Sequence, residues 1–211
     1  MKFEKDMLLL YAVTDNAWVG KQTLLEQIEE ALRGGVTIVQ LREKEMNTEA
    51  FIEEAILVKE LCHKYNVPLI INDNVEVALK SGADGVHVGI EDIPVAEIRK
   101  QVPEDFIIGA TCKTIEQALE AEKAGANYMG VGAVFPSPTK TNAVRITNEE
   151  LQRIVSVVSI PAVAIGGISK DNAMQIKGSG VSGIAVVSAI FGADDIESAT
   201  KELKEIAKNI R

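Results

Sequence analysis

The 211-residue chain has little cysteine and few aromatic residues, and it contains no long hydrophobic run. Its two cysteines, Cys62 and Cys112, belong to no CxxC or metal-ligand spacing, so we expect free thiols in a reducing compartment. No apolar segment is long enough to cross a bilayer, and the apolar stretch near the N-terminus is too short and too acidic in its flanks for a signal peptide. These absences predict a cytoplasmic location.

The chain also has fewer basic than acidic residues: 22 Lys and Arg against 31 Asp and Glu, which gives a formal net charge of −9. That balance argues against nucleic acid or an anionic membrane as a partner. An anionic ligand would have to be held by local positive groups. No linker or low-complexity segment interrupts the chain, so residues 1–211 are expected to form a single domain.

A recurring pattern of glycine followed by a short apolar run stands out against this background. It begins at Gly35, Gly82, Gly125 and Gly180, so each interval holds roughly two strand–helix units. A glycine there can take the left-handed conformation that ends a helix before a buried strand begins. The period therefore predicts a repeating β/α architecture.

Apolar, β-branched runs predict eight strands, and segments with helical spacing lie between them. Continuous apolar strands that alternate with helices indicate parallel pairing with both faces covered. Eight units favour closure into a single (β/α)8 TIM barrel of the α/β class, with an open doubly wound sheet as the alternative. The strands are expected near 8–13, 36–41, 68–71, 84–88, 106–110, 127–131, 161–165 and 182–187, and the helices near 21–33, 48–65, 75–81, 94–101, 115–124, 147–158, 169–178 and 195–209.

In such a barrel the loops that follow the strands form one rim, where the reacting groups gather. The second strand runs into QLREK, and alternation along an extended segment places Gln40, Arg42 and Lys44 on one face, with Leu41 and Glu43 opposite. An amide, a guanidinium and an ammonium group together suit a planar polar ring or a phosphate. The alternative is a set of surface charges paired with neighbouring glutamates.

Acidic residues follow the next two strands. Asn72 and Asp73 end the third strand, and Glu91 and Asp92 follow the fourth. The Asp73 and Asp92 carboxylates on adjacent loops suit a hard divalent ion that keeps waters and completes its shell with phosphate oxygens. Ordinary loop or helix-capping aspartates are the alternative. His87 lies within an apolar run, which favours a packed histidine over a ligand.

Anion-binding groups are expected after the later strands. The fifth strand ends at Thr111, and the longest loop, 135–143, carries hydroxyls at Ser137 and Thr139 together with Lys140. Prolines stiffen this loop, and it is suited to cover an anion. A purely structural loop rich in turn residues is the alternative.

A second anion site is expected after the last two strands. Gly166 and Gly167 follow the seventh strand, and the eighth runs through Val187 into a short helix that begins at Ser188. Backbone N–H groups at these positions form the phosphate site common in β/α barrels. Two phosphorylated substrates, or one substrate with two phosphates, would fit the rim.

With these clusters assembled, the sequence resembles thiamine phosphate synthases nearly from end to end. That resemblance implies a β/α barrel that joins 4-amino-2-methyl-5-pyrimidinylmethyl diphosphate to 4-methyl-5-(2-phosphoethyl)thiazole, giving thiamine monophosphate and pyrophosphate. The segments that carry it, in this order, are LYAVTD (10–15), GVTIVQLREK (35–44), PLIIND (68–73), GADGVHVG (82–89), GVGAVFPSPTKTNA (130–143), IPAVAIGGI (160–168) and GIAVVSAI (183–190).

The resemblance also implies a role for each residue at a matching position. Magnesium ligands fall on Asp73 and Asp92, and Arg42, Lys140 and Thr111 are the expected catalytic residues. Ionisation of the pyrimidine is expected before the thiazole attacks, without a protein nucleophile. The oligomeric state stays open, with a homo-oligomer as one alternative. Pyrimidine diphosphate contacts fall on Gln40, Leu41, Arg42, Glu43, Lys44, Asn72, Thr111 and Lys140, and thiazole phosphate contacts on Ser137, Pro138, Thr139, Gly167, Val187 and Ser188.

Some positions depart from the family pattern: Asn74, Ile90 and Lys113 are unusual, Thr111 replaces a serine and Ser137 replaces a threonine. The closest rival is a thiazole tautomerase of the same fold, which needs a general base on the fifth-strand loop, where Lys113 stands. QLREK and both aspartates count against that rival. A phosphosugar isomerase or epimerase, and a barrel that only senses a ligand, are the remaining alternatives.

Overall fold

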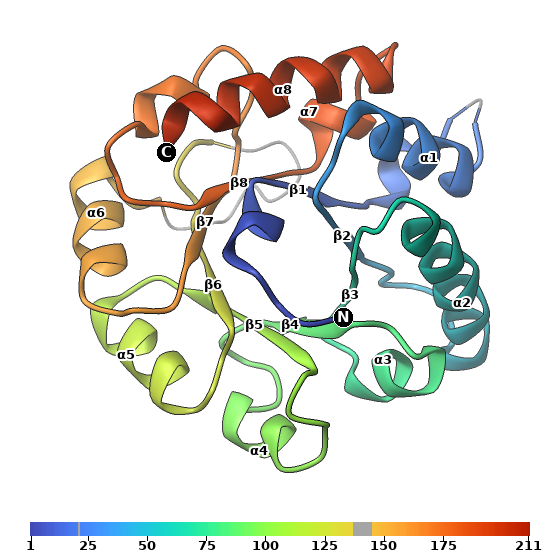
Figure 1. The fold of residues 1–211 in the computed structure, drawn as a ribbon, viewed down its shortest axis with the longest axis horizontal. Helices are drawn as coiled ribbons and strands as arrows, with labels where there is room; N and C mark the ends of the chain where they lie inside the picture. The colour runs from blue at the N-terminus through green and yellow to red at the C-terminus, as the bar shows by residue number, and fades with distance from the viewer. Residues whose placement is uncertain (21, 137–144) are drawn as a thin grey trace.

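The computed structural model describes residues 1–20, 22–136 and 145–211. Eight parallel strands close into a barrel in chain order, and β8 pairs back onto β1 (Figure 1). The predicted TIM barrel is therefore confirmed over the open sheet. The strands are β1 (Leu10–Val13), β2 (Ile38–Leu41), β3 (Leu69–Asn72), β4 (Gly85–Val88), β5 (Ile107–Cys112), β6 (Tyr128–Gly132), β7 (Ala162–Ile165) and β8 (Gly183–Val186).

Helices surround the barrel on the outside, as Figure 1 shows. Two of them, α1 and α3, end at the predicted glycines Gly35 and Gly82, which have φ angles of 98° and 67°. The α-helices are α1 (Leu24–Gly34), α2 (Thr48–Lys64), α3 (Val75–Ser81), α4 (Val95–Arg99), α5 (Ile115–Lys123), α6 (Asn148–Ser156), α7 (Ser188–Phe191) and α8 (Ile196–Ile210), and the 3-10 helices are η1 (Lys5–Leu8), η2 (Asn16–Trp18) and η3 (Ala173–Ile176).

The helix predicted over 169–178 is wrong, because this segment forms only the short η3. Asn172 accepts a hydrogen bond from the backbone N–H of Ser169 (2.9 Å) and donates one to the carbonyl of Gly167 (2.8 Å). Such local side-chain bonds offer the backbone an alternative to the helical ladder. The β7–β8 connection is consequently a braced turn rather than a full helix.

Alternation along the strands divides the core into two layers. The outer layer lies between the strands and the helices and includes Leu41. The inner layer fills the barrel itself, so the barrel is a packed core rather than a pore. Its members are Leu8, Tyr11, Val13, Ile38, Ile70, Ile107, Tyr128, Val163 and Ala185.

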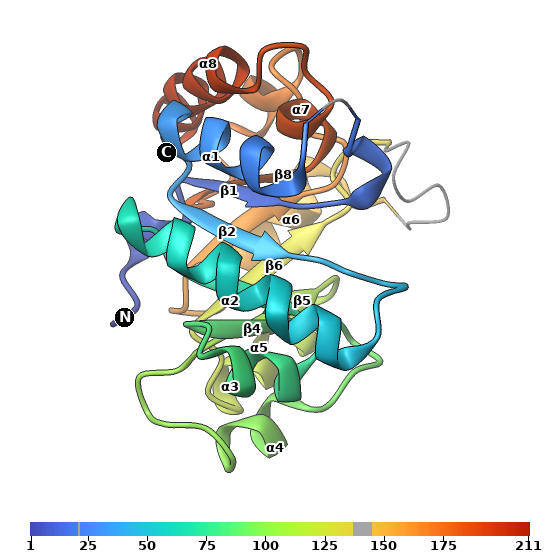
Figure 2. The ribbon, with the colours of Figure 1, turned by 90° about the vertical axis from the view of Figure 1, so that its right-hand side faces the viewer.

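The N-terminal segment closes one end of the barrel. It lies within the ring of strands in Figure 1. In Figure 2 the N-terminus lies at the amino ends of the strands, opposite the arrowheads. The ring of Phe3 stacks on that of Tyr128, with centroids 5.8 Å apart. A cavity inside the barrel must therefore open toward the carboxyl ends of the strands.

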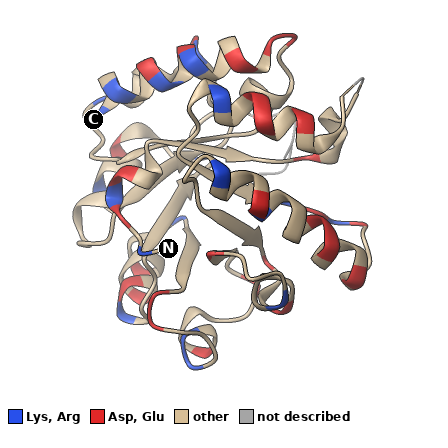
Figure 3. Cartoon of the chain, turned by 45° about the vertical axis from the view of Figure 1, so that its right-hand side comes forward, with Lys and Arg blue, Asp and Glu red and all other residues tan. Residues whose placement is uncertain are grey.

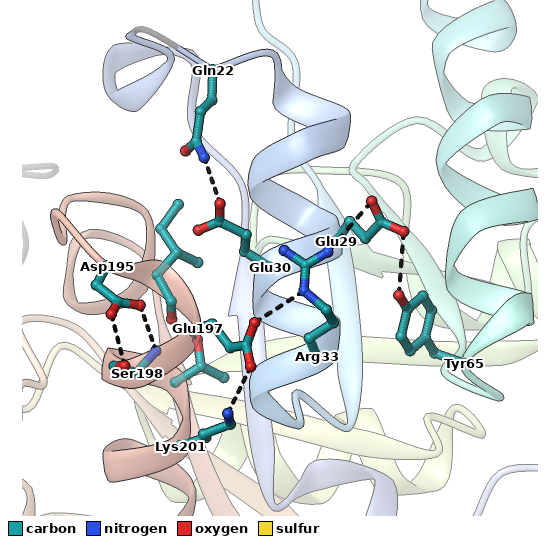
Figure 4. A network of polar contacts seen from close by, with 11 residues as sticks. Gln22, Glu29, Glu30, Arg33, Tyr65, Asp195, Glu197, Ser198 and Lys201 are labelled. Carbon is teal, nitrogen blue, oxygen red and sulfur yellow. Dashed lines mark hydrogen bonds and ion pairs between the residues drawn. The ribbon is translucent and has the colours of Figure 1, made fainter.

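Charged side chains are carried by the helices and loops, whereas the strands are almost free of them (Figure 3). Figure 4 shows one network, in which Arg33 of α1 binds Glu197 of α8 at 3.0 Å and Tyr65 donates to Glu29 at 3.2 Å. Exposed pairs of this kind add little stability. Both cysteines are free and buried. None of the described helices is long and apolar enough to span a membrane.

Candidate active site

A cavity of about 220 Å³ opens at the carboxyl ends of the strands. It is lined by side chains that point into the barrel, together with residues from the turns that follow the strands. Position on this rim is typical of TIM-barrel active sites. The predicted site residues that line it are Gln40, Arg42, Asn72, Thr111, Gly167, Val187 and Ser188.

Glu43 and Lys44 lie elsewhere, in a neighbouring groove that also contains Asn72 and Asp73. The predicted alternation does not extend to Lys44, because β2 ends at Leu41 and Lys44 lines the groove rather than the cavity. Only the first two members of the predicted face line the cavity. Lys44 instead lines the groove together with Asp73.

Leu41 is fully buried in the outer layer and lines neither the cavity nor the groove. Its side chain packs toward the helices, as the alternation from Gln40 requires. Ser137, Pro138, Thr139 and Lys140 lie outside the described residues.

Arg42 is held by an acidic residue at the end of β1. Its Nη1 lies 2.6 Å from Oδ2 of Asp15, and its backbone N–H donates to the Thr14 hydroxyl at 2.9 Å. The other carboxylate oxygen of Asp15 accepts from the backbone N–H of Ala17. Because a guanidinium group has five N–H donors, this ion pair orients Arg42 and leaves donors for an anion in the cavity.

A chain of hydrogen bonds crosses the interior of the barrel through residues of five strands. Gln40 Nε2 donates to the Tyr11 hydroxyl (2.8 Å), and that hydroxyl lies 2.7 Å from the hydroxyl of Tyr128. The Tyr128 hydroxyl lies 3.0 Å from Nδ1 of His87, whose Nε2 is 3.0 Å from the Thr111 hydroxyl. Both ends of this relay chain, Gln40 and Thr111, line the cavity.

Burial fixes the protonation of the relay chain. It lowers the pKa of His87 from 6.5 to about 4 and raises the pKa of both tyrosines, so all three are neutral at pH 7. Gly109 makes room for them, because a Cβ there would overlap the Tyr128 ring and Nδ1 of His87. His87 is packed, as predicted, but it also lines the cavity and positions Thr111.

Asp73 and Asp92 form a carboxyl pair beside the cavity. Asp73 has a φ of 61°, and its backbone N–H donates to the carbonyl of His87 at 2.8 Å. Asp92 Oδ2 accepts from the N–H of Gly89 at 2.6 Å. Burial, the hydrogen bond to Asp92 and the charge of that carboxyl group together raise the pKa of Asp73 to about 6. A cation between the two carboxylates would relieve this repulsion.

The two carboxylates supply oxygen ligands, which suit a hard divalent cation that keeps some of its bound water. In the described ranges, no three His, Cys, Asp or Glu residues gather where they could hold a metal. Two carboxylates therefore have to be supplemented by water or by ligand oxygens, which is how Mg²⁺ is commonly bound next to phosphates. The residues present fit a magnesium ion.

The turns after β7 and β8 form the other side of the cavity. Gly166 and Gly167 have φ angles of 101° and 64°, and a Cβ on Gly167 would overlap the carbonyl oxygen of Pro136. The predicted short helix is present as α7, which begins at Ser188. Backbone N–H groups can approach a phosphate closely here, because no side chain intervenes at the two glycines.

Sequence reasoning missed Tyr11, Asp15 and Tyr128 as parts of this site. The alternation rule applied to Gln40 and Arg42 would have found the first two, because Tyr11, Val13 and Asp15 share the inward face of β1 and all line the cavity. Tyr128 gives no such signal, since it lies below the cavity and acts through its contacts to other strands.

Comparison with known proteins agrees with this geometry. The family model described as thiamine monophosphate synthase matches residues 10–190. A thiamine-phosphate synthase of Ruminiclostridium cellulolyticum is 51% identical over 95% of both chains, and one of Methanobrevibacter smithii is 47% identical over 96% of this chain and 97% of its own. The solved thiamine phosphate pyrophosphorylase of Pyrococcus furiosus superposes with a TM-score of 0.90 at 42% identity, covering 98% of each chain. The chain belongs to the thiamine monophosphate synthase family.

Proposed function

We propose that the protein joins 4-amino-2-methyl-5-pyrimidinylmethyl diphosphate to 4-methyl-5-(2-phosphoethyl)thiazole, giving thiamine monophosphate and pyrophosphate. Membership of the family supports the overall transfer reaction. The observation that carries the choice of substrates is the division of the cavity. Arg42 and the carboxyl pair lie after β2, β3 and β4, while the glycine turn and Ser188 follow β7 and β8 across the barrel.

The reaction needs charge stabilisation more than proton transfer. The bond between the pyrimidine methylene carbon and the diphosphate oxygen breaks, and its electron pair leaves with pyrophosphate. The lone pair of the thiazole nitrogen then forms the new C–N bond, so no proton is removed from either substrate. The site suits this chemistry, because both ring nitrogens of His87 are engaged and its low pKa makes it a poor base at pH 7.

Positive charge near the leaving group is the main catalytic requirement. Arg42 is oriented toward the cavity by Asp15, and the resemblance adds Lys140 from outside the described residues. Thr111 lies where its hydroxyl can donate to a diphosphate oxygen. Mg²⁺ held by Asp73 and Asp92 would supply further positive charge to the departing diphosphate.

The thiazole phosphate is assigned to the glycine turn and the start of α7. Gly167, Val187 and Ser188 line that part of the cavity, and Asn172 braces the turn by donating to the carbonyl of Gly167 at 2.8 Å. The resemblance adds Ser137, Pro138 and Thr139. Because the two phosphorylated groups are held apart, the reacting carbon and nitrogen can meet between them.

The test is product analysis with the purified protein, both substrates and magnesium. We expect pyrophosphate and thiamine monophosphate in equal amounts, with neither formed when the thiazole phosphate is omitted. Conversion of a thiazole carboxylate phosphate to its tautomer, without pyrophosphate release from the pair of substrates, would support the tautomerase instead and contradict the proposal. The cytoplasmic location and a homo-oligomeric state stay predictions.

A further inference from the structure

The relay chain can run in only two directions, because each of its members has a fixed supply of protons. A tyrosine hydroxyl donates one hydrogen bond, and a neutral imidazole has one donor and one acceptor nitrogen. Within a chain of this kind, every link must therefore point the same way. Reversing the link at Gln40 requires reversing the links through Tyr11, Tyr128 and His87 as far as Thr111.

In one direction, Gln40 Nε2 donates to Tyr11, as in the structure. Tyr11 then donates to Tyr128, Tyr128 donates to Nδ1 of His87, and Nε2–H of His87 donates to the Thr111 hydroxyl oxygen. Thr111 is left with its own proton to give to a ligand. In the opposite direction, the Thr111 hydroxyl donates its hydrogen bond to Nε2 of His87. The Gln40 amide then presents its NH₂ group to the cavity instead of its oxygen.

A phosphate oxygen accepts hydrogen bonds and does not donate them when ionised, so it selects the first direction. A phosphate oxygen at Thr111 accepts the hydrogen bond of the threonine hydroxyl. Every other hydrogen bond of the relay chain must then point in the first direction, as far as Gln40. The free oxygen Oε1 of Gln40 then faces the cavity as an acceptor. An exocyclic amino group on a ring is the partner that such an oxygen accepts from.

We propose that Tyr11, Tyr128 and His87 are positioning residues that couple diphosphate binding at Thr111 to recognition of the ring amino group at Gln40. This inference rests on the proposed function, which places the diphosphate and the pyrimidine at those two ends. Its consequence is specificity. A 4-oxo pyrimidine would present a carbonyl oxygen to Gln40 Oε1, and two acceptors would then face each other.

Tyr128 is the link at which the coupling can be broken without touching the ligand. It is fully buried and does not line the cavity. Replacing it with phenylalanine removes one oxygen and keeps the stack on Phe3. Tyr11 is then free to donate to Gln40 Oε1, so the amide can present its NH₂ group and accommodate a carbonyl.

The first experiment compares kcat/KM for the 4-amino and 4-oxo pyrimidine diphosphates in wild type, Tyr128→Phe and Tyr65→Phe. Tyr65 is the matched control, since its hydroxyl bonds to Glu29 on the outer surface (Figure 4). We expect the wild type to prefer the amino substrate by on the order of 10². The preference should fall about tenfold in Tyr128→Phe and stay unchanged in Tyr65→Phe, because one misdirected buried hydrogen bond costs on that scale. A purely structural defect would slow both substrates alike, so an unchanged preference in Tyr128→Phe overturns the inference.

A second measurement uses the wild type alone and needs no turnover. Calorimetry gives the affinity of 4-amino-5-hydroxymethyl-2-methylpyrimidine and of its 4-oxo analogue, with and without saturating pyrophosphate. We expect pyrophosphate to tighten binding of the amino compound and to weaken binding of the oxo compound. The same effect on both would overturn the coupling, even if the protein forms thiamine monophosphate. A failure of product formation alone would instead overturn the proposed function.

Discussion

The guanidinium group of Arg42 lies 2.6 Å from the carboxylate of Asp15, at the wall of the cavity where β1 and β2 end. Both side chains are largely buried, with 22% and 14% of their surfaces exposed, so solvent screens this pair less than a surface pair. Asp15 therefore both orients Arg42 and offsets part of its charge. By offsetting that charge, Asp15 weakens the attraction of the site for an anionic product.

Two substitutions separate these effects. Arg42→Ala should lower kcat by about 10²–10³, because it removes a cation from the leaving group. Asp15→Asn keeps an acceptor for the N–H of Ala17 but removes the charge, so pyrophosphate should inhibit more strongly, by roughly tenfold. Product-inhibition kinetics measure both, with Arg33→Ala on the outer surface as the control. Weaker pyrophosphate inhibition in Asp15→Asn would contradict this role.

Asp73→Asn and Asp92→Asn should each abolish most magnesium-dependent activity, by on the order of 10²–10³, while leaving the fold intact. Asparagine tolerates the positive φ of residue 73, so the backbone need not change. Initial rates are measured at a series of magnesium concentrations and in EDTA, with Glu76→Gln on α3 as a nearby control. Wild-type activity that is unaffected by EDTA, with both variants near wild type, would show that the reaction does not use the metal.

The free energy of unfolding should decrease as the pH is lowered, because of His87. Its pKa is lowered on folding from 6.5 to about 4, so its contribution is fully present above pH 6.5 and is lost as pH falls through this window. Between pH 7 and pH 5 the loss is about 2 kcal/mol, at 1.36 kcal/mol per unit. Urea unfolding at several pH values measures this loss as the difference between the protein with His87 and the variant His87→Gln.

Asp73 acts with the opposite sign in the same range, since its folded pKa is raised from 3.8 to about 6. The folded state then binds the proton first, and acid favours folding through this group. Both proteins in the His87 comparison should therefore carry Asp73→Asn. Equal pH slopes with and without His87 would show that the buried imidazole does not govern acid stability.

Lys113 lines the cavity at the end of β5. Its ammonium group should add to the attraction for a phosphorylated substrate. We expect Lys113→Ala to raise the KM for the pyrimidine diphosphate by about tenfold, with the effect shrinking at high salt. Lys123→Ala, on the exposed last turn of α5, is the control. An unchanged KM at low salt would assign Lys113 to the surface.

The sequence predicts the barrel well because its signals are local. Glycines such as Gly35 and Gly82 end helices by their own backbone freedom, and buried strands need only an apolar run. The helix predicted over 169–178 is wrong because another local interaction competes with it: the side chain of Asn172 holds the backbone in a turn. Propensity alone does not reveal that competition.

The site is harder to predict because it depends on register between strands. Tyr11 and Tyr128 are 117 positions apart, and only closure of the barrel brings their hydroxyls within 2.7 Å. Lys44 shows the converse, because alternation along β2 holds only as far as Leu41, where the strand ends. Predicted positions such as Arg42, Gly167 and Val187 do line the cavity, whereas the contacts among the site residues required the structure.

If the site acts by stabilising a departing pyrophosphate, the rate of pyrophosphate release should depend on how well the pyrimidine carries positive charge. We would measure that rate with a trifluoromethyl-substituted pyrimidine diphosphate. An electron-withdrawing group destabilises the cation that forms as the C–O bond breaks. If about 3 kcal/mol of stabilisation is lost, release should slow by on the order of 10² relative to the natural substrate. Release of pyrophosphate from both compounds at the same rate would contradict ionisation before attack.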